Sequence, residues 1–237
     1  MAVELTWLGH ATWSLNTGDV TILVDPFLDD SPTAPVKADQ VEADFILISH
    51  GHADHCSDAV KIAKRTGALV ISNFEICQWL AAQGVEKTMA HNLGGGSQHA
   101  WGHVQLTLAH HSSQLPDGQY GGNPSGFLLS LAGGGPNLYF ACDTALFYDM
   151  KLIGTVGIDL AILPIGDLFT MGPTDALQAV KLLQPKRVVP SHFGTWPPIE
   201  QDANAWAESV KKETRVEVTV LKPGEKLSVW ENIPRAS

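Results

Sequence analysis

Four side chains that bind metal ions well lie within residues 50–55, which read HGHADH. Histidine offers a neutral nitrogen and aspartate an anionic oxygen, and divalent zinc, iron or manganese accept such mixed ligands. Alternate side chains of a nearly extended segment point the same way, so His50 and His52 can bind one ion while Asp54 and His55 turn toward a second. The competing interpretation is a polar surface turn, which rarely gathers four such groups in so short a stretch.

This loop cannot complete two coordination shells by itself, because each ion needs a further protein ligand and a catalytic ion needs an open position. Three later segments end predicted strands with His or Asp, and sites in layered α/β proteins gather at strand ends. They are LAHHSS with His110 and His111, YFACDT with Asp143, and VVPSHFGTW with His192. A single His or Asp at the end of a strand is more often structural. Three successive strand ends that carry His or Asp favour a shared metal site. The strand pattern leaves the choice between His110 and His111 open.

Taken together, these motifs resemble the metallo-β-lactamase superfamily over essentially the whole chain. Longer segments are similar to its branch of metal-dependent hydrolases, which is related to ascorbate-phosphate lactonase and N-acyl-phosphatidylethanolamine phospholipase D. They are LGHAT, DPF at 25–27, HHSS, DTALFYDMKLIG, LPIGDLFTMGP and VVPSHFGTWPPIEQD. The resemblance implies an α/β fold, the four-layer αβ/βα sandwich.

The resemblance also implies how two divalent metal ions share the ligands, with zinc as the expected metal and manganese or iron as alternatives. The family's His-Ser-Ser pattern selects His111 and leaves His110 as a neighbour of the site. The implied ligands are His50, His52 and His111 for the first ion, Asp54, His55 and His192 for the second, and Asp143 bridging both.

Two positions depart from related patterns. Cys142 precedes the bridging aspartate where the family often has glycine, and we expect it to be a small buried hydrophobic residue. His52 stands where oxygen reductases of the flavodiiron type prefer a carboxylate. The second departure argues against an oxygen-reductase function.

Two further residues are candidates for assisting the ligands. His10 either donates a hydrogen bond to the oxygen of the bond being broken or is a structural histidine. Asp25 either orients a metal-bound imidazole through its far nitrogen or accepts backbone N–H groups in a turn.

Three segments are candidates for the substrate side. In relatives the stretch GDLFTMGPTDA approaches the mouth of the site, so Asp167, Phe169 and Met171 are expected to line a pocket. The glycine-rich residues 119–126 are expected to form a flexible loop over the site. Trp196, followed by two prolines, is expected to form a rigid wall beside His192.

The elements that must position these residues follow from the hydrophobic pattern. Short strands joined by turns are expected at 3–9, 12–17 and 21–27, and a run apolar on both faces predicts a central strand at 43–50. Helices are expected at 57–65, 73–84, 174–183 and 201–213, and further strands at 68–72, 103–111, 125–131, 137–143, 159–165 and 187–192.

Two strand-rich halves with helices attached predict two mixed β-sheets packed face to face with helices outside. Because we find no linker, residues 1–237 are predicted to form a single metallo-β-lactamase-like domain.

Composition narrows the classes of function. Acidic residues outnumber basic ones by 25 to 15, and the basic residues do not cluster, so no long nucleic acid is expected as a partner. The first residues lack the pattern of a signal peptide, no apolar run approaches a membrane span, and the three cysteines share no close spacing. We therefore expect a cytoplasmic protein with a small-molecule substrate and no membrane span. Relatives often form homo-oligomers.

The predicted function is hydrolysis at a binuclear metal site, where a metal-bridging hydroxide attacks a phosphodiester, phosphotriester, lactone or carboxylic ester. Asp54 would accept the proton, and His10 is the second catalytic candidate. Within the superfamily, the alternatives are a β-lactamase, disfavoured by the bridging Asp143, and an RNA-processing nuclease, disfavoured by the acidic charge. An iron-dependent redox enzyme and a non-catalytic metal-binding module are alternatives of other classes.

Overall fold

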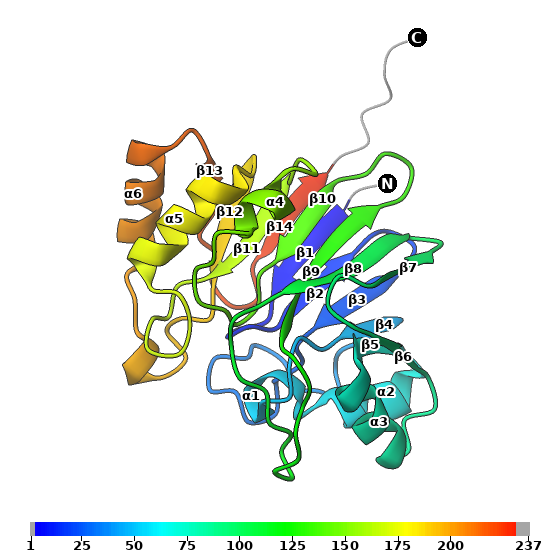
Figure 1. Cartoon of the computed structure of the whole chain (residues 1–237). Coiled ribbons are helices and arrows are strands. Elements are labelled where there is room, and N and C mark those ends of the chain that lie inside the picture. Colours follow the sequence, from blue (N-terminus) through cyan, green and yellow to red (C-terminus); the bar gives the residue numbers. More distant parts are fainter. Residues whose placement is uncertain (1–2, 231–237) are drawn as a thin grey trace.

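Two mixed β-sheets of seven strands each form the framework of the protein (Figure 1). The computed structural model describes residues 3–230. The predicted single domain over 1–237 stays a prediction, because residues 1–2 and 231–237 lie outside the described part.

The first sheet joins the N-terminal strands to the last strand of the chain. Strands β3 to β6 run parallel, whereas β14, β1, β2 and β3 pair antiparallel. In spatial order they are β14 (Lys226–Trp230), β1 (Val3–Trp7), β2 (Trp13–Asn16), β3 (Thr21–Val24), β4 (Phe45–Leu47), β5 (Leu69–Asn73) and β6 (Thr88–His91).

The second sheet repeats this mixture of antiparallel and parallel pairing. Strands β7 to β10 pair antiparallel, and β10 to β13 run parallel. In spatial order they are β13 (Glu217–Val218), β12 (Arg187–Ser191), β11 (Leu160–Pro164), β10 (Asn137–Phe140), β9 (Ser125–Leu131), β8 (Gly102–Leu108) and β7 (Gly96–His99).

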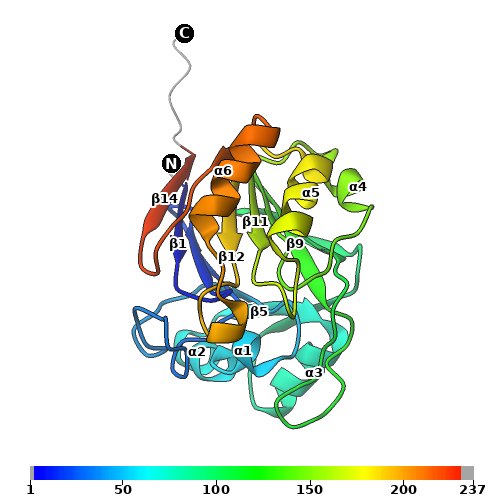
Figure 2. The ribbon, with the colours of Figure 1, turned by 90° about the vertical axis from the view of Figure 1, so that its left-hand side faces the viewer.

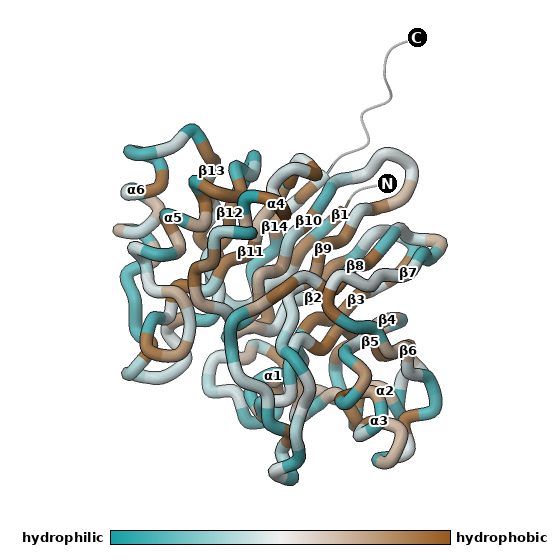
Figure 3. The backbone as a smooth tube through the Cα atoms, in the orientation of Figure 1, coloured by the Kyte–Doolittle hydropathy of each residue, from teal (hydrophilic) through white to brown (hydrophobic). Residues whose placement is uncertain are grey.

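An apolar core lies between the sheets because alternate side chains of their strands point inward. In β1 the inward residues are Val3, Leu5 and Trp7, which pack in one cluster with Val104 and Phe127 of the second sheet. Hydrophobic residues follow the strands of both sheets (Figure 3). This shared core holds the two halves of the chain face to face.

Helices cover the outer face of each sheet. Helices α1 (Ala53–Cys56), α2 (Ala59–Thr66) and α3 (Phe74–Ala82) lie against the first sheet, and α4 (Met150–Gly154), α5 (Pro173–Leu183) and α6 (Ala203–Glu213) lie against the second (Figure 2). A short 3-10 helix, η1 (Pro197–Ile199), follows β12. The predicted four-layer αβ/βα sandwich is therefore confirmed.

Local signals explain where these helices begin and end. The Asn73 side chain caps α3 by accepting from Ile76 N, and the Asp202 side chain caps α6. Gly67 ends α2 with φ 70°, a left-handed conformation that glycine adopts readily. Within residues 3–230, no helix combines the length and apolar character needed to cross a membrane.

The sequence patterns predict most elements but miss several short ones. The strand expected at 43–50 is confirmed only as β4, although Asp44 and Ile48 on either side of it still bond to the neighbouring strands. The helix expected at 57–65 begins at Ala59 instead, since residues 53–56 form the separate helix α1. The patterns do not predict α4, β6, β7, β13 or β14. Strand β7, with sequence GSQH, carries no apolar residue that could reveal it.

Candidate metal centre

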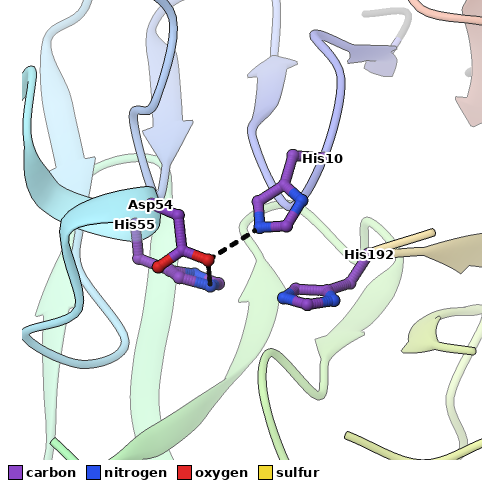
Figure 4. Close-up of side chains that lie close together, drawn as sticks. All are labelled: His10, Asp54, His55 and His192. Carbon is purple, nitrogen blue, oxygen red and sulfur yellow. Dashed lines mark hydrogen bonds and ion pairs between the residues drawn. The ribbon is translucent and has the colours of Figure 1, made fainter. Parts of the chain in front are cut away.

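The predicted metal-binding residues come from loops that follow neighbouring strands. His50 follows β4, His111 follows β8, Asp143 follows β10 and His192 follows β12 directly. His10 arrives from the loop after β1. The structure therefore brings strand ends of both sheets to one edge of the sandwich, where the loops after β1 and β12 face helix α1 (Figure 4).

The backbone of the HGHADH loop changes conformation in its middle. His52 is extended, with φ −66° and ψ 145°, and α1 begins at the next residue. His50 and His52 therefore lie on an extended segment, whereas Asp54 and His55 lie on a helical turn. This change turns Asp54 and His55 away from the extended segment, although the His50 and His55 rings stay close, with centroids 4.2 Å apart.

Several residues beside the site adopt a left-handed backbone conformation that L-amino acids rarely use. The φ angles of His10, Asp25, Cys142 and His192 are 50°, 45°, 52° and 53°. Such conformations cluster at functional sites because the surrounding structure must hold them against strain.

Three imidazoles form the first group. His50 Nε2 lies 3.0 Å from His52 Nδ1, which lies 3.3 Å from His111 Nε2. The candidate ligand atoms of these three residues all lie within 4.8 Å of one another. Three nitrogens that converge in this way can bind one cation.

The second group contains His10, Asp54, His55 and His192, whose candidate ligand atoms also lie within 4.8 Å of one another (Figure 4). Asp54 Oδ2 is 3.2 Å from His10 Nε2 and 3.9 Å from His55 Nε2. The three imidazoles are buried, whereas the Asp54 side chain is 31% exposed. The group is therefore open to solvent on the side of Asp54.

Asp143 connects the two groups. Its Oδ2 atom lies 3.0 Å from His192 Nε2, 3.3 Å from His55 Nε2 and 3.7 Å from His111 Nε2. His111 belongs to the first group, and His55 and His192 belong to the second. One buried carboxylate thus reaches both groups.

Several buried polar atoms of this centre have no hydrogen-bond partner among residues 3–230. They are Asp143 Oδ1 and His192 Nδ1, together with His55 Nε2 and His192 Nε2, which approach Asp143 Oδ2 without the geometry of a hydrogen bond. Burying polar atoms without a partner is unfavourable, and imidazole nitrogens and carboxylate oxygens are typical ligands of divalent ions. The side chains present here therefore fit bound metal ions.

A network around Asp25 orients the ligand candidates from behind. Asp25 Oδ2 lies 2.9 Å from His55 Nδ1 and accepts from Ser49 Oγ at 2.6 Å. Ser49 Oγ also lies 2.9 Å from His50 Nδ1. These contacts hold the far nitrogens of both imidazoles, so that each Nε2 faces the centre. They match the orienting role considered for Asp25.

Burial sets the protonation of the imidazoles. Burial, followed by the neighbouring charge of His55, holds the pKa of His50 well below its usual value. Burial and the nearby His192 lower the pKa of His10 to about 4. Both rings are therefore neutral at pH 7, which is the form that can bind a metal ion.

The buried carboxylate carries negative charge at this centre. Burial alone would raise the pKa of Asp143, but the charges of His192 and His55 outweigh burial and lower it well below the usual range. For the imidazole of His55 the effect of burial has the opposite sign and would lower its pKa, but Asp143 and then Asp25 raise it well above its usual value. The carboxylates thus favour positive charge at this position, which a divalent ion can supply in place of a proton.

Two of the predicted neighbours lie apart from these groups. His110 is exposed, and its ring packs 5.2 Å from the ring of Phe147. Cys142 points behind the centre, and burial, followed by the charges of Asp25 and Asp143, raises the pKa of its thiol well above the usual value. Cys142 is half-buried, which agrees in part with the expected small buried residue.

Sequence reasoning did not single out Ser49 and Thr195. Ser49 contacts Asp25 and His50, and Thr195 Oγ1 lies 2.8 Å from His10 Nδ1. Each hydroxyl lies within three residues of a ligand candidate, which is the signal that could have identified it.

Comparisons with known proteins identify the family of the chain. Residues 4–192 match the beta-lactamase superfamily domain. A UPF0173 metal-dependent hydrolase of Thermus thermophilus is 48% identical over 225 residues, which are 95% of this chain and 98% of the relative. Another, from Desulforamulus reducens, is 46% identical and covers 96% of this chain and 100% of the relative. Igni18, a metallo hydrolase of the archaeon Ignicoccus hospitalis, matches with a TM-score of 0.87 at 34% identity, over 96% of this chain and 98% of that protein.

The family expected from the motifs is thereby confirmed, and the chain belongs to the beta-lactamase superfamily as a metal-dependent hydrolase of the UPF0173 group.

Proposed function

We propose that this protein is a binuclear metallohydrolase that cleaves a phosphodiester, phosphotriester, lactone or carboxylic ester. The observation that carries the proposal is the position of Asp143, whose Oδ2 lies 3.7 Å from His111 and 3.0 Å from His192. The proposed ligands of two divalent ions, preferably zinc, are His50, His52 and His111 for one, Asp54, His55 and His192 for the other, and Asp143 for both.

Bound by these ligands, two divalent ions would supply an activated water near neutral pH and would polarise the oxygen of the substrate's reacting group. Asp54 would accept the proton of that water, because its carboxylate is partly exposed and faces the second group. Burial alone would raise the pKa of Asp54, but the hydrogen bond from His10 and the charge of His55 lower it. The carboxylate is therefore ionised, which is the form that a metal ligand or a proton acceptor requires, while the lowered pKa makes it a weak base.

His10 would position Asp54 rather than contact the substrate. Its side chain is fully buried, and both ring nitrogens have partners, Thr195 Oγ1 at 2.8 Å and Asp54 Oδ2 at 3.2 Å. A neutral ring carries one proton, so Nε2 can donate to Asp54 while Nδ1 accepts from Thr195. These contacts support the structural alternative for His10 over a hydrogen bond to the scissile group.

A redox function is the second candidate, because proteins of this fold include both kinds of enzyme. An isothiocyanate hydrolase from Delia radicum gut bacteria has a TM-score of 0.75 at 20% identity, and CmlA, a diiron β-hydroxylase of Streptomyces venezuelae, has 0.72 at 16%. Likeness at this level concerns the fold alone. Elemental analysis with a visible spectrum separates the two: colourless protein with zinc supports hydrolysis, and iron with oxygen uptake supports the redox function.

A substrate panel tests the proposal directly. Purified protein is assayed with bis-p-nitrophenyl phosphate, a phosphotriester, a lactone, a p-nitrophenyl ester and a cephalosporin. The assays are repeated after chelation and after zinc is restored. We expect turnover of at least one ester, its loss on chelation and its recovery with zinc. Chelated, metal-free protein that keeps full activity contradicts the proposal, and a preference for the cephalosporin favours the β-lactamase alternative.

A further inference from the structure

The loop between β11 and α5 places two large apolar side chains in solvent. Leu168 is 63% exposed and Phe169 is 59% exposed. Water disfavours exposed apolar side chains, and neighbouring ones commonly mark a site that contacts a ligand or partner. The loop extends toward the end of the molecule that carries α1 (Figure 2).

Both ends of this loop are fixed beside proposed metal ligands. At its start, a Cβ atom placed on Gly166 would lie 2.2 Å from the carbonyl oxygen of His192, so the two backbones are in close contact. At its end, Met171 N donates to the carbonyl oxygen of Thr144 at 2.9 Å. Thr144 follows Asp143 directly. Both ends of the loop are therefore held beside residues at or next to the metal centre.

The tip has a strained backbone. Asp167 and Leu168 have φ angles of 62° and 35°, so two consecutive residues other than glycine are left-handed. Backbone hydrogen bonds hold this turn closed, from Asp167 N to the Met171 carbonyl at 3.1 Å and from Thr170 N to the Asp167 carbonyl at 2.9 Å. Such strain persists mainly where function requires the conformation.

Trp196 adds a third apolar side chain beside the metal centre. Its ring centroid lies 5.0 Å from that of His10 and 6.0 Å from that of Phe27. The residue stands four positions after His192 and is partly exposed. Its indole therefore presents an open surface next to the second group of ligand candidates.

The segments that carry or adjoin the proposed ligands contain no lysine or arginine: residues 50–58, 110–124, 143–149, 165–172 and 192–200. They do contain acids that are not ligand candidates, among them Asp117, Asp149, Asp167 and Glu200. The whole chain carries a formal net charge of −10. An anionic group that extended from the reacting bond would meet acidic side chains of these segments and no lysine or arginine from them.

We infer that the substrate is an uncharged ester whose acyl or aryl group packs against Leu168, Phe169 and Trp196, here named the apolar rim. The inference rests on the proposed function and narrows its substrates to carboxylic esters, lactones and phosphotriesters, excluding phosphodiesters. Apolar contact with the acyl or aryl group contributes binding free energy. Because no lysine or arginine stands at the rim, negatively charged substrates are selected against.

Matched p-nitrophenyl esters test this selectivity, because they share one leaving group. From the acetate to the octanoate ester, kcat/KM of the zinc-loaded enzyme is expected to rise by about tenfold or more, below the limit for fully buried methylenes. The valerate ester is expected to react at least about tenfold faster than the glutarate half-ester, which has the same length and ends in a carboxylate. Equal or faster hydrolysis of the glutarate overturns the inference.

Paired surface variants locate the contact. Leu168→Ser with Phe169→Ser removes two of the three rim side chains and is expected to reduce the rise in kcat/KM from acetate to octanoate by at least about threefold. Leu152→Ser is the matched control, because Leu152 is 66% exposed and lies on α4, where Gly154 packs against Leu183 at the far end of α5. This control is expected to keep the dependence. A chain-length dependence that is the same in the double variant and the wild type contradicts the inference.

Binding of the neutral dye Nile red gives a readout that needs no metal. Chelated protein is expected to bind the dye, and the Leu168→Ser, Phe169→Ser variant to bind it about fivefold more weakly, with no change in the Leu152→Ser control. Unchanged dye binding in the double variant overturns the inference. If sedimentation shows that the double variant turns an oligomer into monomers, the rim is a contact between copies and the inference is wrong.

These outcomes separate the inference from the proposed function. Wild-type protein that hydrolyses no ester in a metal-dependent way contradicts the proposed function. Metal-dependent hydrolysis that ignores chain length and charge contradicts the inference alone.

Discussion

Asp25 Oδ2 lies 2.9 Å from His55 Nδ1, and both side chains are fully buried. The carboxylate is fixed in turn by Ser49, whose backbone N–H donates to Oδ1 at 2.7 Å and whose hydroxyl donates to Oδ2 at 2.6 Å. A carboxylate in this position keeps the proton of His55 on Nδ1 and leaves Nε2 free for a metal ion.

We therefore predict that Asp25→Asn lowers metal affinity by about 10- to 100-fold, because the amide no longer fixes the ring through a charged acceptor. Competition against a coloured chelator measures the affinity. Asp29→Asn is the control, since Asp29 pairs with Lys61 near the surface at 2.6 Å. Equal affinity in the wild type and Asp25→Asn would show that His55 needs no such support.

Two adjacent histidines should respond differently to the same substitution. His111 Nε2 lies 3.3 Å from His52 Nδ1 and 3.7 Å from Asp143 Oδ2, whereas His110 packs against Phe147. We expect His111→Asn to lose one bound ion and to reduce kcat/KM by about 100-fold or more, the upper end expected for a disrupted metal site. His110→Asn should keep both ions and remain within about threefold. Similar losses in both variants would contradict the proposed ligand set.

The metal-free protein should lose stability as the pH falls from 6.5 to about 4. Burial and the nearby His192 lower the pKa of His10 from 6.5 to about 4, so in this window the unfolded state binds the proton first. The pKa of Asp54 is lowered from 3.8, so this group changes the unfolding free energy only below pH 3.8. The pKa of His55 is raised from 6.5, so this group changes it only above pH 6.5. Neither group therefore contributes between pH 6.5 and 4.

Urea unfolding of chelated protein at several pH values measures this effect. The free energy of unfolding of the wild type should fall more steeply than that of His10→Asn, by up to about 1.4 kcal/mol per pH unit. Asparagine is a suitable replacement because it tolerates the left-handed backbone at this position. If the free energy of unfolding falls with the same slope against pH in the wild type and in His10→Asn, a buried neutral His10 is excluded.

Gly166 should not tolerate a side chain. A Cβ atom there would lie 2.2 Å from the His192 carbonyl oxygen, so Gly166→Ala must displace the backbone of a proposed ligand. We expect a loss of about 2 kcal/mol in unfolding free energy together with weaker metal binding. Gly118→Ala is the comparison, because no atom of residues 3–230 lies within 4 Å of its Cβ position, although its φ of 88° is left-handed. A loss of stability without any change in metal binding would show that the close backbone contact of Gly166 does not position the proposed ligand His192.

The sequence predicts the HGHADH loop well because its four ligand candidates are local and follow an apolar strand. His111, Asp143 and His192 are predictable from strand ends alone, except that the strand pattern cannot choose between His110 and His111. The structure brings His111 within 3.7 Å of Asp143 while His110 packs against Phe147, which supports His111 as the proposed ligand.

Contacts that depend on which strands are neighbours could not be predicted. The bond between Ser49 and Asp25 exists because β3 and β4 pair in parallel, which brings the residues after each strand together. Strand β14 pairs with β1 across nearly the whole chain, with Trp230 opposite Val3, and no local pattern reveals that partner. The left-handed turn at Asp167 and Leu168 lacks the glycine that usually signals one.

The number of metal ions bound per chain tests the central claim most directly. Chelated protein is saturated with zinc, freed of excess metal and measured by elemental analysis against protein concentration. The proposed ligand set predicts about two zinc ions per chain, which is the requirement for a binuclear site. A value of one at saturation would contradict the shared role of Asp143 and with it the binuclear mechanism.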